Sequence, residues 1–260
     1  MSAALDYLLH LADNALILGQ RNAEWCGHGP ILEEDIALSN VSLDLIGQAR
    51  LLYQLAARLK GGECSEDRLA YFRDSGEFRN YTLLELPHSG PLSGYAKGSL
   101  DYATTIVRNF LYSALMALLW EALEQSADAD LAAIAAKSQK EVRYHLRHSR
   151  DWLVRLGDGT DESHERMQGA LDRMWRYSGE LFESDSVTLA MVAAGIGPDP
   201  QSLRTASDRT LDAVLSEATL TVPTTTPIAG TGRFGRHSEH LGYLLAEMQY
   251  LHRQHPGATW

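Results

Sequence analysis

Apolar residues recur every three or four positions through most of the chain, a spacing that is typical of amphipathic helices. The first such segment follows Ser2, which can cap a helix, and extends to about Glu24 with apolar residues at positions 5, 8, 9, 12 and 16. A second segment starts at about Glu33 and ends at Gly61 and Gly62, which favour a helix end. No alternation typical of a strand competes with these patterns.

The remaining periodic segments predict further helices. They cover about residues 66–73, 99–126, 130–156, 160–182, a short stretch after Ser186, 199–218 and 238–253. Asp199 followed by Pro200 is typical of a helix start, and Asp128 or Asp130 can cap the segment that stops at Gly157. Turn residues between positions 87 and 94, and a Thr-, Pro- and Gly-rich stretch at 220–237, predict irregular connections.

The longest segments determine the predicted architecture. Residues 33–60 and 130–156 would each form a helix of about 27 residues, or roughly 40 Å. Long helices joined by connections pack readily as a four-helix bundle. We therefore predict an all-α fold, a four-helix bundle with extra C-terminal helices, in which residues 1–260 form a single domain.

Composition restricts the partners and the compartment. The net charge is −11 and no block of Lys or Arg offsets it, so we expect no nucleic-acid partner. The longest apolar run, residues 109–120, is shorter than the roughly 20 residues that span a bilayer, and predicts a buried core helix rather than a membrane contact. Cys26 and Cys64 lack a zinc-binding spacing and suit a reducing compartment. The N-terminal residues lack the basic region of a signal peptide, so the chain is predicted to be soluble and cytoplasmic.

Metal chemistry is the first catalytic possibility in a helical bundle. Di-metal bundles use one Glu from each of two helices and a Glu-x-x-His pair from each of the other two. The one literal match, Glu85 to His88, contains Pro87 and is predicted to be a loop. On the segment at 140–152, Glu141 and His145 share a helix face, but Tyr144 occupies the position three residues after the glutamate.

The helix at 33–60 also lacks a required donor. Its central polar residues are Asp44 and Gln48, and no histidine occurs from residue 29 to residue 87. Glutamine is a poor substitute for imidazole as a ligand. With the two carboxylates that could face inward added, the full set is Glu24, Asp44, Gln48, Glu121, Glu141, Tyr144 and His145. One histidine where two are needed predicts a vestigial site, an inward polar network held by hydrogen bonds.

Other readings of these residues stay open. A working di-metal centre, or a single metal held by Glu141, His145 and His148, would use the same helix face. Two histidines flank Ser238 at residues 237 and 240, where helix capping by Ser238 explains the stretch as well as a metal would. The Gly-rich residues 230–235 are predicted to be a flexible loop.

Three segments carry a specific resemblance: residues 24–50 (EWCGHGPILEEDIALSNVSLDLIGQAR), 140–163 (KEVRYHLRHSRDWLVRLGDGTDES) and 237–260 (HSEHLGYLLAEMQYLHRQHPGATW). They resemble the non-catalytic, structural subunits of bacterial phenylacetyl-CoA 1,2-epoxidases, and the similarity extends over the whole chain. It implies a ferritin-like bundle. It also implies that this chain pairs with a paralogous catalytic subunit, whose intact Glu-x-x-His corresponds to Leu45 to Gln48 here.

The resemblance implies how the chemistry is divided. The catalytic paralogue would hold the di-iron centre and bind most of phenylacetyl-CoA, and a reductase component would bring electrons from NADPH through FAD and an iron–sulfur cluster. This chain would then carry no catalytic, metal or cofactor-binding residue of its own. Two alternatives are an oxygenase active in its own right and a stand-alone helical interaction protein. Arg143, Arg147 and Arg150 could meet coenzyme A phosphates or be solvated helix charges.

Overall fold

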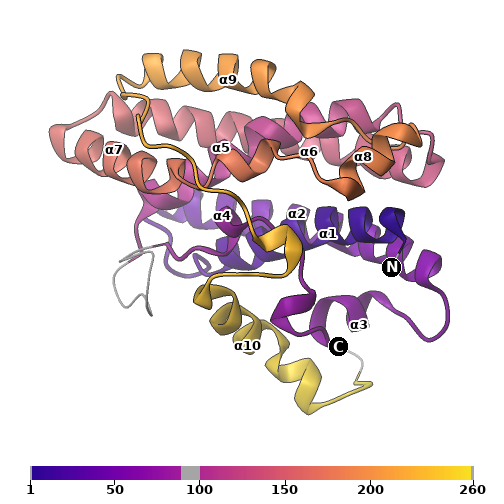
Figure 1. Ribbon diagram of the computed structural model, residues 1–260. Helices are drawn as coiled ribbons and strands as arrows, with labels where there is room; N and C mark the ends of the chain where they lie inside the picture. The colour runs from indigo at the N-terminus through magenta and orange to yellow at the C-terminus, as the bar shows by residue number, and fades with distance from the viewer. Residues whose placement is uncertain (1, 89–99, 259–260) are drawn as a thin grey trace. The chain divides into compact units, whose positions relative to one another are not determined.

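The computed structural model describes residues 2–88 and 100–258, and within these ranges every regular element is a helix (Figure 1). The all-α class is therefore confirmed for this part of the chain. The described residues divide into two compact units, one formed by residues 2–87 and 231–258 and the other by residues 88 and 100–230. The single domain expected from the sequence stays a prediction, and each unit is described by itself.

Two long helices form the core of the first unit. They are α1 (Ala3–Ala23) and α2 (Leu32–Lys60). As predicted, the Ser2 hydroxyl caps α1 by accepting the Leu5 N–H at 3.3 Å, and α2 ends before Gly61. The helices are antiparallel, because Gly19 meets Leu45 near one end while Asp13 meets Tyr53 near the other.

Shorter elements complete this unit. They are α3 (Glu66–Tyr71), the 3-10 helix η1 (Ser75–Glu77), α4 (Thr82–Glu85), the 3-10 helix η3 (Gly232–Phe234) and α10 (Glu239–Gln254). The C-terminal helix α10 packs against α1, α3, α4 and η1, so the end of the described chain returns to its beginning (Figure 1). Short elements such as η1 and α4 escape the sequence prediction, because one turn of helix is too short to show a period.

The second unit is built around an apolar helix. Its elements are α5 (Tyr102–Leu123), α6 (Ala129–Gly157), α7 (Asp161–Trp175), the 3-10 helix η2 (Gly179–Phe182), α8 (Ser186–Ala193) and α9 (Pro200–Glu217). Helix α5 packs against α6, α7 and α9, which run beside it (Figure 1). By length and composition α5 could cross a membrane, but 78% of its most apolar stretch is buried. It is the core helix that the apolar run predicts.

One helix boundary predicted from the sequence is wrong. The expected helix from 160 to 182 ends at Trp175 and is followed by a turn and η2. The carbonyl of Arg176 accepts the Ile228 N–H at 2.8 Å, so the connection at 220–237 takes a bond that a longer helix would have used. Gly179 lies too close to Pro227 for any side chain. The turn residues predicted at 89–94 lie outside the described residues.

Candidate functional site

A buried carboxylate, Asp13 of α1, is the centre of a polar network in the first unit. Its Oδ1 accepts the Tyr53 hydroxyl at 2.5 Å, and its Oδ2 accepts the Arg79 backbone N–H at 2.7 Å. Arg73 donates to both oxygens through its two terminal nitrogens. The side chain of Asp13 is 0% exposed and that of Arg73 is 8% exposed, so this ion pair is removed from water.

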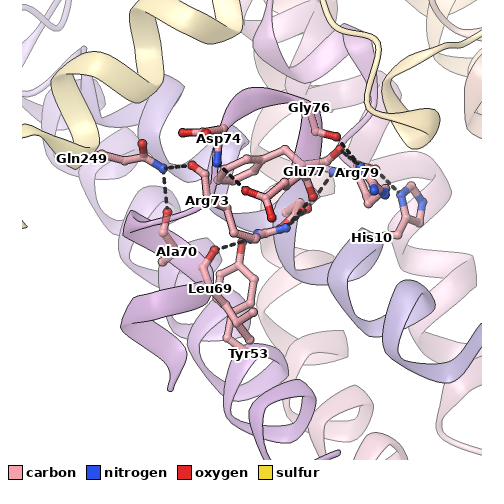
Figure 2. A network of polar contacts seen from close by, with 12 residues as sticks. His10, Tyr53, Leu69, Ala70, Arg73, Asp74, Gly76, Glu77, Arg79 and Gln249 are labelled. Carbon is pink, nitrogen blue, oxygen red and sulfur yellow. Dashed lines mark hydrogen bonds and ion pairs between the residues drawn. The ribbon is translucent and has the colours of Figure 1, made fainter. Parts of the chain in front are cut away.

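Arg73 extends the network along the chain that follows α3, as Figure 2 shows. Its Nε donates to the carbonyl of Leu69 at 2.5 Å and its Nη1 to that of Glu77 at 2.9 Å. The guanidinium also lies 4.2 Å from the ring centre of Phe78. Burial opposes the charged form of Arg73, but the charge of Asp13 dominates and raises its pKa. The nitrogens of this arginine thus tie residues 69–79 to α1 and α2.

A second buried carboxylate, Glu85, is 0% exposed at the end of α4. Its Oε2 accepts from His237 Nδ1 at 2.7 Å and from Asn80 Nδ2 at 2.9 Å. Its Oε1 accepts the Ser238 backbone N–H at 2.5 Å. Glu85 therefore fastens the start of α10 to the segment that precedes α4.

The protonation state of His237 follows from its contacts. The other ring nitrogen, Nε2, lies 3.0 Å from the carbonyl oxygen of Phe78. A carbonyl and a carboxylate can only accept, so both ring nitrogens must carry protons and the ring is an imidazolium. Burial lowers the pKa of His237, but the hydrogen bond to Glu85 and the charge of Glu85 outweigh it and raise the pKa above its ordinary value.

His10 shows the opposite state nearby on α1. Its Nδ1 donates to the Arg79 carbonyl at 2.6 Å, and its Nε2 accepts from Asn14 Nδ2 at 3.2 Å. One donating and one accepting nitrogen define a neutral ring. Burial and the charge of Arg233 hold the pKa of His10 well below its ordinary value.

These two carboxylates are not free to bind a metal. Asp13 accepts four hydrogen bonds and Glu85 accepts three, so their lone pairs are directed at protein donors. The Glu-x-x-His match at 85–88 is not a ligand pair, as predicted, because His88 Nδ1 lies 2.5 Å from Thr105 Oγ1 and 2.7 Å from Arg108 Nη2. The arrangement holds the fold together rather than presenting a reactive group.

The predicted vestigial residues of the first unit lie on α1 and α2. Glu24 directly follows α1 and accepts from Arg21 Nη1 at 2.5 Å. Gln48 is buried on α2, with Asp44 half-buried one turn before it. These three residues thus have polar surroundings, and whether they form one network with the others stays a prediction.

Two predicted members in the second unit do not face inward. Glu141 is half-buried, with Lys137 Nζ at 3.9 Å, and His145 is buried. Tyr144 is 39% exposed, because the buried stripe of α6 passes through His145 and the preceding residue points about 100° away. Glu121 is exposed beside the fully buried Trp120 on α5 for the same reason. Including Tyr144 and Glu121 in an inward network is therefore wrong.

Metal ligands do not gather in the part of the chain that the structure describes. Among residues 2–88 and 100–258, no group of three or more His, Cys, Asp or Glu side chains could hold a metal ion. His148 stacks on the ring of Tyr144, with ring centres 6.0 Å apart. The donor set therefore does not fit a di-metal centre or the single site at Glu141, His145 and His148.

The arginines on α6 are partly engaged with protein groups. Arg150 donates to Asp151 at 2.8 Å and to Glu217 at 2.5 Å, and Arg147 lies 5.6 Å from the ring centre of Tyr144. Arg150 is therefore less available to a phosphate than the sequence suggests.

Comparison with known proteins agrees with the missing donors. A family model described as phenylacetic acid catabolic protein matches residues 1–260. The chain belongs to this family. It is 46% identical over 260 residues, the whole of both chains, to the Escherichia coli (strain K12) protein whose name makes it the C-type subunit of 1,2-phenylacetyl-CoA epoxidase.

In this phenylacetic acid catabolic protein, sequence reasoning missed the most buried polar groups. Glu85 and His237 are 152 positions apart, and Asp13 and Arg73 are 60 apart, so no local spacing connects them. Ser238 precedes α10 as expected, but its side chain makes no capping bond, and its backbone N–H binds Glu85 instead. The one available signal is an acid placed among apolar helix positions, as at Asp13.

Proposed function

We propose that this chain is the C-type, structural subunit of a phenylacetyl-CoA epoxidase in phenylacetate catabolism. The observation that carries the proposal is the 46% identity to the Escherichia coli epoxidase component over the full length of both chains. The poor donor set supports a non-catalytic role, because Gln48 and Tyr144 stand where a di-metal bundle needs imidazole.

In this proposal the chemistry belongs to other subunits. A paralogous subunit holds the di-iron centre and binds most of phenylacetyl-CoA, and a reductase with FAD and an iron–sulfur cluster delivers electrons from NADPH. This chain adopts the ferritin-like fold that its family implies, acts in the cytoplasm and supports the catalytic subunit. Its own polar groups, Asp13 and Glu85 with their partners, keep the supporting surface rigid.

The test combines activity with metal content. We expect the catalytic subunit alone to turn over poorly, the two subunits together with reductase to epoxidise the substrate, and this chain with reductase to show no turnover. After incubation with ferrous iron and desalting, the purified chain should retain less than about a tenth of an equivalent of iron by plasma mass spectrometry. Close to two equivalents, with turnover in the absence of the partner, would establish an oxygenase in its own right.

A further inference from the structure

Large apolar side chains are exposed at the beginning of α2. Ile31 is 50% exposed, Leu32 72%, Ile36 52% and Leu43 66%. We call these four residues the α2 face. Single exposed hydrophobic residues are ordinary on a protein surface, but adjacent ones on one helix typically mark a binding surface.

The α2 face has the geometry of a helix-packing seam. Leu32, Ile36 and Leu43 are four and seven positions apart, which places them in one row along the helix. The other side of the same turns carries the buried residues Leu38 and Val41. The row covers about 16 Å of helix. It is long enough to pack against two or three turns of another helix.

Charge around the α2 face has a single sign. From residue 22 to residue 49 the sequence contains no Lys or Arg, and its acids are Glu24, Glu33, Glu34, Asp35 and Asp44. Three of these acids lie in the first turn of α2. A partner that covers the apolar row must therefore bring positive charge to its rim.

We propose that the α2 face docks a helix of another subunit of the epoxidase, one with an apolar seam flanked by Lys or Arg. This inference rests on the proposed function, because it assumes that the chain works in a complex. A second copy of this chain is the poorer occupant, because symmetric pairing would place five acids against the same five. An anionic membrane surface is disfavoured by the same charge.

The test compares two pairs of exposed apolar residues in the full chain. The double variant Ile36→Ser with Leu43→Ser alters the α2 face. The matched control, Leu189→Ser with Val192→Ser on α8, alters residues that are 53% and 40% exposed. Because all four side chains are exposed, both variants should unfold at temperatures close to that of the wild type. The dissociation constant with the purified catalytic subunit is then measured for each protein.

We expect the α2 variant to bind at least about tenfold more weakly, and the control to change less than about twofold. Glu33→Gln should reduce the salt dependence of the association rate. Equal binding by wild type and α2 variant would overturn the docking proposal while leaving the proposed function intact. No binding by the wild type would refute the proposed function itself. A wild-type homodimer that the α2 variant disrupts would overturn the choice of partner.

Discussion

The buried ion pair between Asp13 and Arg73 allows a quantitative prediction. Asp13→Asn keeps the size of the side chain but removes its charge. The amide has one oxygen for the donors that now reach two, and its NH2 group faces donors rather than acceptors. Arg73, with a side chain only 8% exposed, is left as a buried cation without its counter-charge.

The expected cost follows from that unpaired charge. Removing one partner of a buried ion pair destabilises a protein by about 3–5 kcal/mol. A typical folded domain has about 5–15 kcal/mol of stability in total. Asp13→Asn should therefore lose a large share of the stability of the first unit. Replacing both residues, as Asp13→Leu with Arg73→Met, should cost less than the sum of the single changes, because no buried charge is then left alone.

Urea unfolding followed by circular dichroism measures this loss, and hydrogen exchange of residues 66–80 locates it. The matched control is Asp208→Asn on α9, whose partner Arg204 lies 3.1 Å away with side chains 46% and 43% exposed. A surface pair of this kind contributes about 0.5 kcal/mol or less. If Asp13→Asn cost less than about 1 kcal/mol, the reasoning that the buried pair holds residues 69–79 in place would be refuted.

Two further predictions concern the segments that meet Glu85 and η1. The pKa of His237 is raised in the folded state, so its stabilisation is complete below the unfolded value of about 6.5 and is lost as pH rises through the folded value; the free-energy gap between wild type and His237→Gln should therefore shrink between pH 6 and pH 9 in urea titrations, and a constant gap would contradict the imidazolium. Gly235→Ala should cost about 2 kcal/mol or more, because φ is 74° and an added Cβ would overlap a backbone carbonyl. Gly242→Ala on α10, where the Cβ has open space, should instead add about 0.5–1 kcal/mol, and equal thermal shifts for the two would show that the close approach is unimportant.

Helix positions were predictable because their signals are local. Ser2, Asp128 and Asp199 each accept a backbone N–H of the following turn, as their place before a periodic segment indicates. Gly61 has a positive φ of 70° at the end of α2. The helix predicted to reach residue 182 failed because the competing bond comes from Ile228, about 50 positions away, which no helical pattern contains.

The candidate site was predictable only in part, for a related reason. Spacing correctly placed Glu141 and His145 near one face of α6, but it could not say which side of α5 or α6 would be covered, so Tyr144 and Glu121 were assigned inward positions that they do not have. Glutamine and tyrosine at ligand positions are chemical facts of the sequence, and these carried the functional reading. The pairing of distant acids and bases is decided by tertiary packing instead.

Phe78 shows how the two buried acids of the first unit depend on each other. Its ring lies under the guanidinium of Arg73, which binds Asp13, while its carbonyl accepts from His237, which binds Glu85. The same residue is thus held from α1 on one side and from the start of α10 on the other. Buried charges are costly to desolvate, and hydrophobic replacements often stabilise as well. We therefore attribute these pairs to the specific placement of residues 69–85 and of α10, a role that suits a subunit whose contribution is a fixed surface.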